Sequence, residues 1–167
     1  MDHLLPTDLV DKARDVIAAN LAAGRRIAVA ESCTGGLVSA ALTEIPGSSA
    51  VFEAGYVTYS DASKMSGLNV CIDVVETFGS VSVATAWAMA QGALLNSGAD
   101  VAVAITGIAG PDGGSLTKPV GMVVFARAEL KDGPDSVTAD QKLFDDSEGR
   151  SGIRRQAALC ALELLMP

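Results

Sequence analysis

The sequence predicts an α/β fold, a layered α/β/α sandwich around a mixed, partly parallel sheet. Two observations lead to this prediction. Short apolar runs alternate with amphipathic segments along the chain, which is the order that strands and helices take in α/β domains. The apolar residues are mostly Ala, Val, Leu and Ile, and only 4% of all residues are aromatic. That composition is typical of helices packed closely against strands.

The first half of the chain is expected to begin with a helix, a strand and a second helix. Apolar residues at helical spacing behind Pro6 predict a helix that runs to about Ala23, where Gly24 ends it. The apolar run 27–30 predicts a buried strand. The other elements expected here are a helix over 37–44, a strand over 54–59 and short helices over 61–65 and 73–78.

The second half continues the alternation. Ser82 is expected to cap a long helix over 83–96, with Gly98 beyond its end. The remaining expected elements are a strand over 101–105, a glycine-rich loop over 106–119, strands over 121–130 and 137–144 joined by a turn over 131–134, and a helix over 151–166.

Length and charge restrict the classes of function. The 167 residues fit one domain, 1–167, and we expect no further N-terminal domain. The net charge of −8 has the wrong sign for a protein that tracks a nucleic-acid backbone. No dense Lys/Arg run predicts a membrane surface either. We therefore expect neither nucleic acid nor membrane as a partner.

Cysteine usage and the N-terminus predict a cytoplasmic protein. The odd set of Cys33, Cys71 and Cys160 shows no pairing pattern for disulfides or zinc, which fits a reducing compartment. The N-terminus lacks the positive leader and long apolar run of a signal peptide. No uncharged apolar stretch reaches the 18 residues of a membrane span.

The single histidine, His3, lies in the N-terminal segment. Ser-His-Asp triads, Cys-His pairs and most catalytic zinc sites need a well-placed histidine. Unless His3 folds back into a site, these mechanisms are excluded. We expect no metal and no cofactor, and any nucleophile here needs a different base.

The first candidate site is the segment Ser-Cys-Thr-Gly-Gly over 32–36, between a predicted strand and a predicted helix. The first amides of a helix have no partner within it, so they can hold a phosphate or an oxyanion. Ser32 would be the nucleophile at the edge of this site, and Thr34, Gly35 and Gly36 would bind the ligand. An ordinary helix cap with a tight glycine turn would give the same pattern.

The second candidate is the segment 55–64, in which a strand ends near Tyr59 and Lys64 lies one helical turn beyond. A lysine acts as a base only when neutral, so its ordinary pKa of about 10.4 must fall. Burial among apolar groups has this effect. The Tyr59 hydroxyl could relay a proton or orient the amine. The alternative is a solvent-exposed helix lysine.

The third candidate is the glycine-rich loop that begins at Thr106. A loop of this kind can surround a ligand with backbone amides. Thr106 could bond a substrate oxygen, and Asp112 could orient the loop or accept from a ribose hydroxyl. The pattern matches neither the phosphate loop nor the dinucleotide fingerprint, and a long structural loop is the alternative. The glycines expected to bind ligand are Gly107, Gly110, Gly113 and Gly114.

Two arginines, Arg150 and Arg154, stand four residues apart near the start of the last helix. That spacing places both on one face, where a guanidinium is the usual partner of a phosphate. A solvated basic face is the alternative. Cys33 is a rival candidate nucleophile because a helix start lowers a thiol pKa, but it lacks a histidine partner.

At these residues the sequence closely resembles the CinA C-terminal domain family, whose stand-alone members are nicotinamide mononucleotide deamidases. The resemblance covers nearly the whole chain. The sequence departs from the family's tail motif, Gly-Asp-Arg-x-x-Val/Ile-Arg, at one point: Gly149 stands where the family has Asp, while both arginines match. The matching segments are 30–36, 46–50, 55–64 and 106–121.

The resemblance implies hydrolysis of nicotinamide mononucleotide to nicotinate mononucleotide and ammonia. It places a Ser/Lys pair on Ser32 and Lys64, a nearby hydroxyl on Tyr59, and ligand-binding groups on 34–36 and 106–114. Two other functions remain open: a regulatory module that binds a nucleotide without turning it over, and a partner-binding protein in DNA uptake or repair. The Ala-rich helix over 83–95 could be core or an interface in a homodimer.

Overall fold

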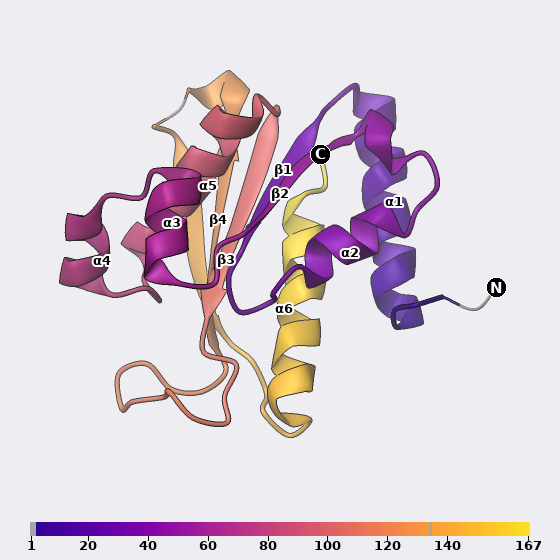
Figure 1. The fold of residues 1–167 in the computed structure, drawn as a ribbon. Coiled ribbons are helices and arrows are strands. Elements are labelled where there is room, and N and C mark those ends of the chain that lie inside the picture. Colours follow the sequence, from indigo (N-terminus) through magenta and orange to yellow (C-terminus); the bar gives the residue numbers. More distant parts are fainter. Residues whose placement is uncertain (1–2, 134) are drawn as a thin grey trace.

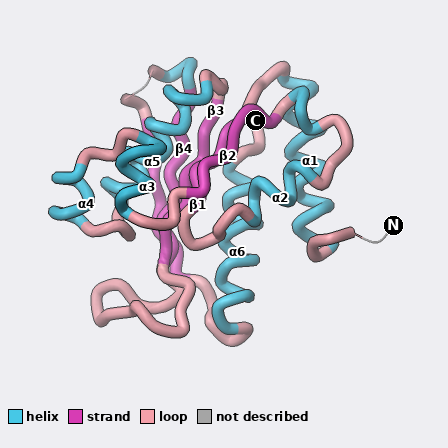
Figure 2. The backbone as a smooth tube through the Cα atoms, in the orientation of Figure 1, coloured by secondary structure: helices cyan, strands magenta, loops and turns pink. Residues whose placement is uncertain are grey.

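The computed structural model describes residues 3–133 and 135–167. Pro134, part of the expected turn, and Met1 and Asp2 lie outside the described residues. A five-stranded sheet in the order β2-β1-β3-β4-β5 forms the middle layer (Figures 1 and 2). Its strands are β1 (Ile27–Glu31), β2 (Phe52–Val57), β3 (Val101–Gly107), β4 (Met122–Glu129) and β5 (Val137–Leu143).

The sheet is mixed, as the alternation predicts. β1 pairs in parallel with β2 and with β3, whereas β3, β4 and β5 pair antiparallel. The carboxyl ends of the three parallel strands therefore meet at one edge of the sheet, where α/β folds place their ligand sites. The predicted fold class, a layered α/β/α sandwich with a partly parallel sheet, is confirmed.

Helices cover both faces of the sheet (Figure 1). One face carries α1 (Thr7–Ala23), α2 (Leu37–Thr43) and α6 (Gly149–Leu164), and the other carries α3 (Asp61–Leu68), α4 (Ile72–Phe78) and α5 (Val83–Ser97). Short 3₁₀ turns cover Ser48–Ala50 and Leu130–Asp132. The main shift from expectation is that α3 runs on to Leu68, because Asn69 takes the left-handed conformation that closes a helix.

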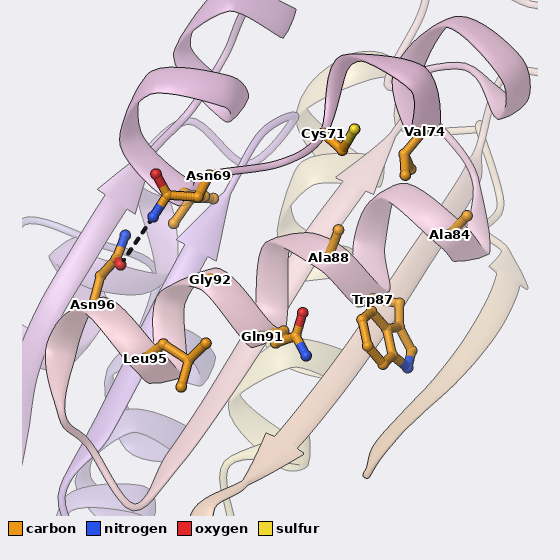
Figure 3. A pocket seen from close by; sticks show the side chains of 11 residues that line it. Asn69, Cys71, Val74, Ala84, Trp87, Ala88, Gln91, Gly92, Leu95 and Asn96 are labelled. Carbon is orange, nitrogen blue, oxygen red and sulfur yellow. Dashed lines mark hydrogen bonds between the residues drawn. The ribbon is translucent and has the colours of Figure 1, made fainter. Parts of the chain in front are cut away.

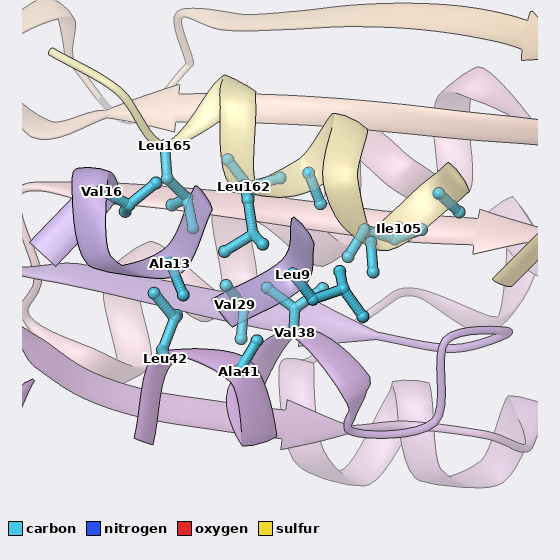
Figure 4. Packing of buried hydrophobic residues seen from close by; sticks show 14 of the residues in the cluster. Leu9, Ala13, Val16, Val29, Val38, Ala41, Leu42, Ile105, Leu162 and Leu165 are labelled. Carbon is cyan, nitrogen blue, oxygen red and sulfur yellow. The ribbon is translucent and has the colours of Figure 1, made fainter. Parts of the chain in front are cut away.

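Successive residues of a strand point to opposite faces, and the two faces of β1 and β3 differ in side-chain size. Val29, Val103 and Ile105 face a cluster of large apolar residues from α1, α2 and α6 (Figure 4). Ala28 and Ala104 face the other cluster, in which α5 presents mainly alanines. Small residues on both sides let α5 lie close to the sheet.

Close packing of α5 also fixes α3, through Gly92. A Cβ at Gly92 would come within 2.0 Å of the Leu68 carbonyl oxygen, so the two helices meet backbone to backbone. At Gly67 on α3, by contrast, a Cβ would make an ordinary 3.5 Å contact with Thr58.

We predict that Gly92→Ala lowers the free energy of unfolding by about 1–3 kcal/mol, because α3 must move to admit the methyl group. The matched control Gly67→Ala, in the last turn of α3, is expected to raise it by up to about 1 kcal/mol, because alanine has less backbone freedom than glycine in the unfolded chain. Urea titration of the two variants measures both values. Equal stability of the two variants would show that α3 and α5 do not touch at Gly92.

Candidate active site

Two side chains from different layers meet at the carboxyl edge of the parallel strands. Ser32 follows β1 directly, and Lys64 lies on α3, which begins four residues after β2 ends. Lys64 Nζ is 3.2 Å from Ser32 Oγ and 3.0 Å from the Thr58 carbonyl oxygen. Lys64 is 1% exposed and Ser32 8% exposed, so the pair is screened from water. A hydroxyl and an amine thus lie within hydrogen-bonding distance in a dry environment.

The surroundings of Lys64 favour its neutral form. Burial lowers the pKa of the Lys64 amine, while the negative charges of Asp61 and of a Cys33 thiolate would act in the opposite direction. The net direction is downward. Within the described residues no carboxylate forms an ion pair with Lys64. An amine of this kind can accept a proton from a neighbouring hydroxyl.

The backbone holds Ser32 in place. Its N–H donates to the Ile105 carbonyl of β3 at 2.9 Å, and its carbonyl accepts from the Gly35 N–H at 3.0 Å. Gly35 and Gly36 have φ values of +62° and +94°, a conformation that residues with a Cβ adopt with strain. The two glycines therefore form the tight turn that places the hydroxyl beside Lys64.

The expected anion site at the start of α2 is filled by the chain's own carboxylate. Glu31 is fully buried and accepts hydrogen bonds from the N–H groups of Gly36 (3.0 Å), Val38 (3.2 Å) and Ser39 (2.9 Å) and from the Ser39 hydroxyl (2.8 Å). The Gly35 amide is also engaged, by Ser32. The expectation that the amides of Gly35 and Gly36 hold a ligand is therefore wrong, because both donate within the protein.

We predict that Glu31→Gln lowers the free energy of unfolding by about 1–3 kcal/mol, because an amide NH₂ would face backbone N–H donors and leave one of them unpaired. Thermal or urea unfolding measures the loss. The exposed Glu76→Gln on α4 is the matched control and should change stability by less than about 0.5 kcal/mol. If the two variants were equally stable, Glu31 would not hold the start of α2.

The other predicted ligand residues fall into two groups. Thr106 is buried, and its hydroxyl donates to the Ser80 carbonyl at 2.7 Å, so its proton is bound within the protein. Gly110 is buried as well, and Gly107 is half-buried. The tip of the loop is exposed and comprises Asp112, Gly113 and Gly114 among its residues.

The two arginines of α6 reach different partners. Arg154 donates to the carbonyls of Cys33 (3.2 Å) and Thr34 (2.9 Å). Arg150 donates to the Gly110 carbonyl at 2.6 Å and to the Tyr59 hydroxyl at 2.7 Å. Their spacing predicted both guanidinium groups on one face of α6, and in the structure the two groups bond different partners.

Tyr59 bonds Arg150 rather than Ser32 or Lys64. Its side chain is 59% exposed, and its hydroxyl accepts from the guanidinium. Across the described residues its hydroxyl has no hydrogen bond to Ser32 or to Lys64. The structure thus brings Ser32 and Lys64 together and links Tyr59 to Gly110 through Arg150.

Cys33 is unsuited to be the nucleophile. Burial raises the pKa of the Cys33 thiol to about 11, so it stays protonated near neutral pH. The only histidine, His3, lies 3.9 Å from Glu44, which follows the end of α2 opposite to Ser32.

Sequence reasoning missed two residues beside the pair, Glu31 and Thr58. Glu31 organises the turn, and the signal for it was an acidic residue at the end of an otherwise apolar strand. The Thr58 carbonyl accepts a hydrogen bond from Lys64, a contact that no sequence pattern predicts. The hydroxyl oxygens of Thr34 and Thr58 are buried without a hydrogen-bond partner in the structure.

A separate apolar groove of about 390 Å³ lies between α5 and the α3–α4 segment (Figure 3). Trp87, Ala88 and Leu95 contribute to its wall, and Asn69 bonds Asn96 across one end. Neither Ser32 nor Lys64 lines it.

No cluster of three or more potential metal ligands occurs within 3–133 and 135–167. Of the helices in these same ranges, none combines the length and the hydropathy that crossing a bilayer requires.

Comparison with known proteins gives one family. The model of the CinA C-terminal domain matches residues 10–167. A crystal structure of the competence/damage inducible protein CihA from Agrobacterium tumefaciens superposes with a TM-score of 0.91 at 45% identity, covering 98% of this chain and 97% of that one.

Curated relatives are of two lengths. The nicotinamide-nucleotide amidohydrolase PncC of Enterobacter agglomerans is 48% identical over 149 residues, which are 89% of this chain and 88% of that protein. A CinA-like protein of Mycolicibacterium vanbaalenii is 51% identical over 88% of this chain but only 34% of its own length. The chain thus spans about a third of several of the relatives that it matches.

Proposed function

The chain belongs to the CinA C-terminal domain family, and on this premise we propose that it hydrolyses the carboxamide of nicotinamide mononucleotide to nicotinate mononucleotide and ammonia. The observation that carries the proposal is the 3.2 Å contact between Lys64 Nζ and Ser32 Oγ in a buried site. A relative of nearly the same length is named for this amide chemistry. The two observations are independent, since one is geometric and the other is sequence likeness.

Lys64 acts as the base in the first step. The Thr58 carbonyl accepts one N–H of the neutral amine, which leaves the lone pair free to accept the Ser32 proton. As the proton moves to Lys64, Ser32 Oγ bonds to the carboxamide carbon, and the carbonyl oxygen becomes an oxyanion.

The second half of the reaction returns the enzyme to its starting state. The Lys64 ammonium gives its proton to the amide nitrogen, the C–N bond breaks, and ammonia leaves an ester on Ser32. Water then attacks this ester while Lys64 accepts a proton from the water. The bond between the acyl carbon and Ser32 Oγ breaks, Lys64 returns its proton to that oxygen, and the acid departs. No step needs a metal or a cofactor.

Arg150 is the residue we assign to the nucleotide phosphate. It is exposed, and its side chain joins the Gly110 carbonyl to Tyr59 at the rim of the site. A guanidinium offers several donors in one plane, so it can donate hydrogen bonds to a phosphate there. We assign the ribose to the exposed loop residues Asp112, Gly113 and Gly114. A local cation of this kind lets an acidic protein bind an anionic substrate.

The proposal is tested by incubating the protein with nicotinamide mononucleotide and measuring ammonia and nicotinate mononucleotide together. We expect one equivalent of each product per substrate consumed. Nicotinamide riboside, which lacks the phosphate, is the control substrate and should react with a higher KM. Absence of both products, with a rise in melting temperature on adding the mononucleotide, would identify a binding module instead of an enzyme.

A further inference from the structure

Two backbone amides in the Ser32 turn lack the usual partner. The N–H groups of Cys33 and Thr34 donate to no oxygen of the described residues, whereas those of Gly35, Gly36 and Leu37 all do. Within the described residues both N–H groups meet the sulfur of Cys33, and neutral sulfur accepts hydrogen bonds weakly. These two donors directly follow the candidate nucleophile.

Both peptide planes that carry these amides are held by their carbonyls. The Cys33 N–H shares its plane with the Ser32 carbonyl, which accepts from Gly35. The Thr34 N–H shares its plane with the Cys33 carbonyl, which accepts from Arg154 Nε at 3.2 Å. A trans peptide carries its C=O and N–H on opposite sides. Holding Cys33 O toward Arg154 therefore turns the Thr34 N–H away from Arg154.

Arg154 and Lys64 approach the turn from opposite layers. Arg154 belongs to α6 and Lys64 to α3, which lie on different faces of the sheet (Figure 1). A second bond, from Arg154 Nη2 to the Thr34 carbonyl at 2.9 Å, fixes the next peptide plane as well. The arginine thus spans two successive carbonyls of a turn 120 residues away in sequence.

The charge of Arg154 is not neutralised by an ion pair. Within residues 3–133 and 135–167 no carboxylate lies within ion-pair distance of it. Glu31, the carboxylate of this turn, is occupied by the amides of α2. The guanidinium charge therefore acts on the peptide units between Ser32 and Gly35.

We propose that Arg154 is a positioning residue that holds the Cys33 and Thr34 amides as the oxyanion hole of Ser32. This inference rests on the proposed amide hydrolysis. It also replaces the expectation that Arg154 binds the substrate phosphate, because Arg154 is half-buried with both of its bonds on the Ser32 turn, whereas Arg150 is exposed.

The test compares Arg154→Met with Arg155→Met, whose side chain pairs with Asp8 at the surface. With nicotinamide mononucleotide, Arg154→Met is expected to lower kcat by about 10–100-fold, since a displaced donor loses much of its effect. Its KM should stay within about threefold of the wild type. Arg155→Met should match the wild type in both constants. Arg154→Lys is the second variant, to be used if Arg154→Met folds poorly. Its lysine keeps the charge and can bond one carbonyl, so it should retain part of the wild-type kcat.

A thioamide substrate separates positioning from a general loss of structure. Sulfur is a weak acceptor, so the wild type should prefer the oxygen amide over thionicotinamide mononucleotide through its oxyanion donors. In Arg154→Met this preference should shrink, because those donors are already misplaced. An unchanged oxygen-to-sulfur rate ratio in Arg154→Met, or a raised KM with unchanged kcat, would overturn the proposal.

A second substrate distinguishes the failure of this proposal from the failure of the proposed function. Acylation of Ser32 by p-nitrophenyl acetate needs the oxyanion hole but no nucleotide. Arg154→Met should slow release of p-nitrophenolate by a similar factor. If the wild type reacted with the ester but not with the mononucleotide, the proposed function would fail while the ester rates still decided the role of Arg154. If the wild type reacted with neither, both proposals would be overturned.

Discussion

Replacing Ser32 with alanine is expected to lower kcat for ammonia release by about 10⁴–10⁶-fold, the usual cost of deleting a serine nucleophile. The physical reason is that the substrate carbon then has no oxygen to bond within the site. Binding should persist, because the amides and Arg150 are unchanged. Steady-state rates and a calorimetric Kd for nicotinamide mononucleotide measure the two effects separately.

The control for Ser32→Ala is Ser97→Ala, which removes a hydroxyl that bonds the backbone at the end of its own helix α5. This variant should keep the wild-type kcat. If Ser32→Ala retained a rate within tenfold of the wild type, water rather than a serine would be the attacking group, and the covalent scheme would be wrong.

Replacing Lys64 with methionine is expected to lower kcat by about 10²–10⁴-fold, the range that general-base catalysis contributes. Methionine fills a similar unbranched volume without a proton acceptor. In the wild type, kcat/KM should rise with pH through the lowered pKa of Lys64, and in Lys64→Met this rise should vanish. Lys12→Met, which removes a helix lysine that pairs with Glu163 at the surface, is the control and should keep the wild-type profile.

The same substitution changes how stability depends on pH. The pKa of Lys64 is lower in the folded chain than its ordinary 10.5. At pH values between the folded-state pKa of Lys64 and 10.5, the unfolded chain binds more protons than the folded chain. Wild-type stability should therefore rise with pH across this window. Lys64→Met lacks this contribution. Its stability advantage over the wild type should therefore be largest at low pH and shrink as pH approaches 10.5. A pH-independent difference would show that Lys64 does not titrate abnormally.

Sequence alone could place Ser32 and Lys64 at one edge of the sheet, because each follows a parallel strand. It could not give their separation, which depends on how closely α3 approaches the sheet. That approach is set by Gly92 and by alanines facing each other across the layer, contacts between residues far apart in the chain.

Three features could not be predicted from the sequence, and the physical reason is the same for each. Glu31 fills the start of α2, Thr106 bonds Ser80, and Arg154 bonds the Ser32 turn. In each case a polar residue in or beside the expected ligand site bonds a backbone group of the protein instead. A sequence shows that a residue can bind an anion or a carbonyl, but only the packed structure shows which partner lies nearest.

The central claim is that Lys64 is neutral enough to take the Ser32 proton, and its own titration tests this most directly. Lysines labelled with ¹³C at Cε give NMR signals that shift on deprotonation, and Lys64→Met identifies the signal of Lys64. The account predicts a midpoint clearly below 10.5 for this signal, while the signal of Lys12 titrates at a higher pH. A midpoint at 10.5 or above would contradict it, because the amine would then be charged in the working enzyme.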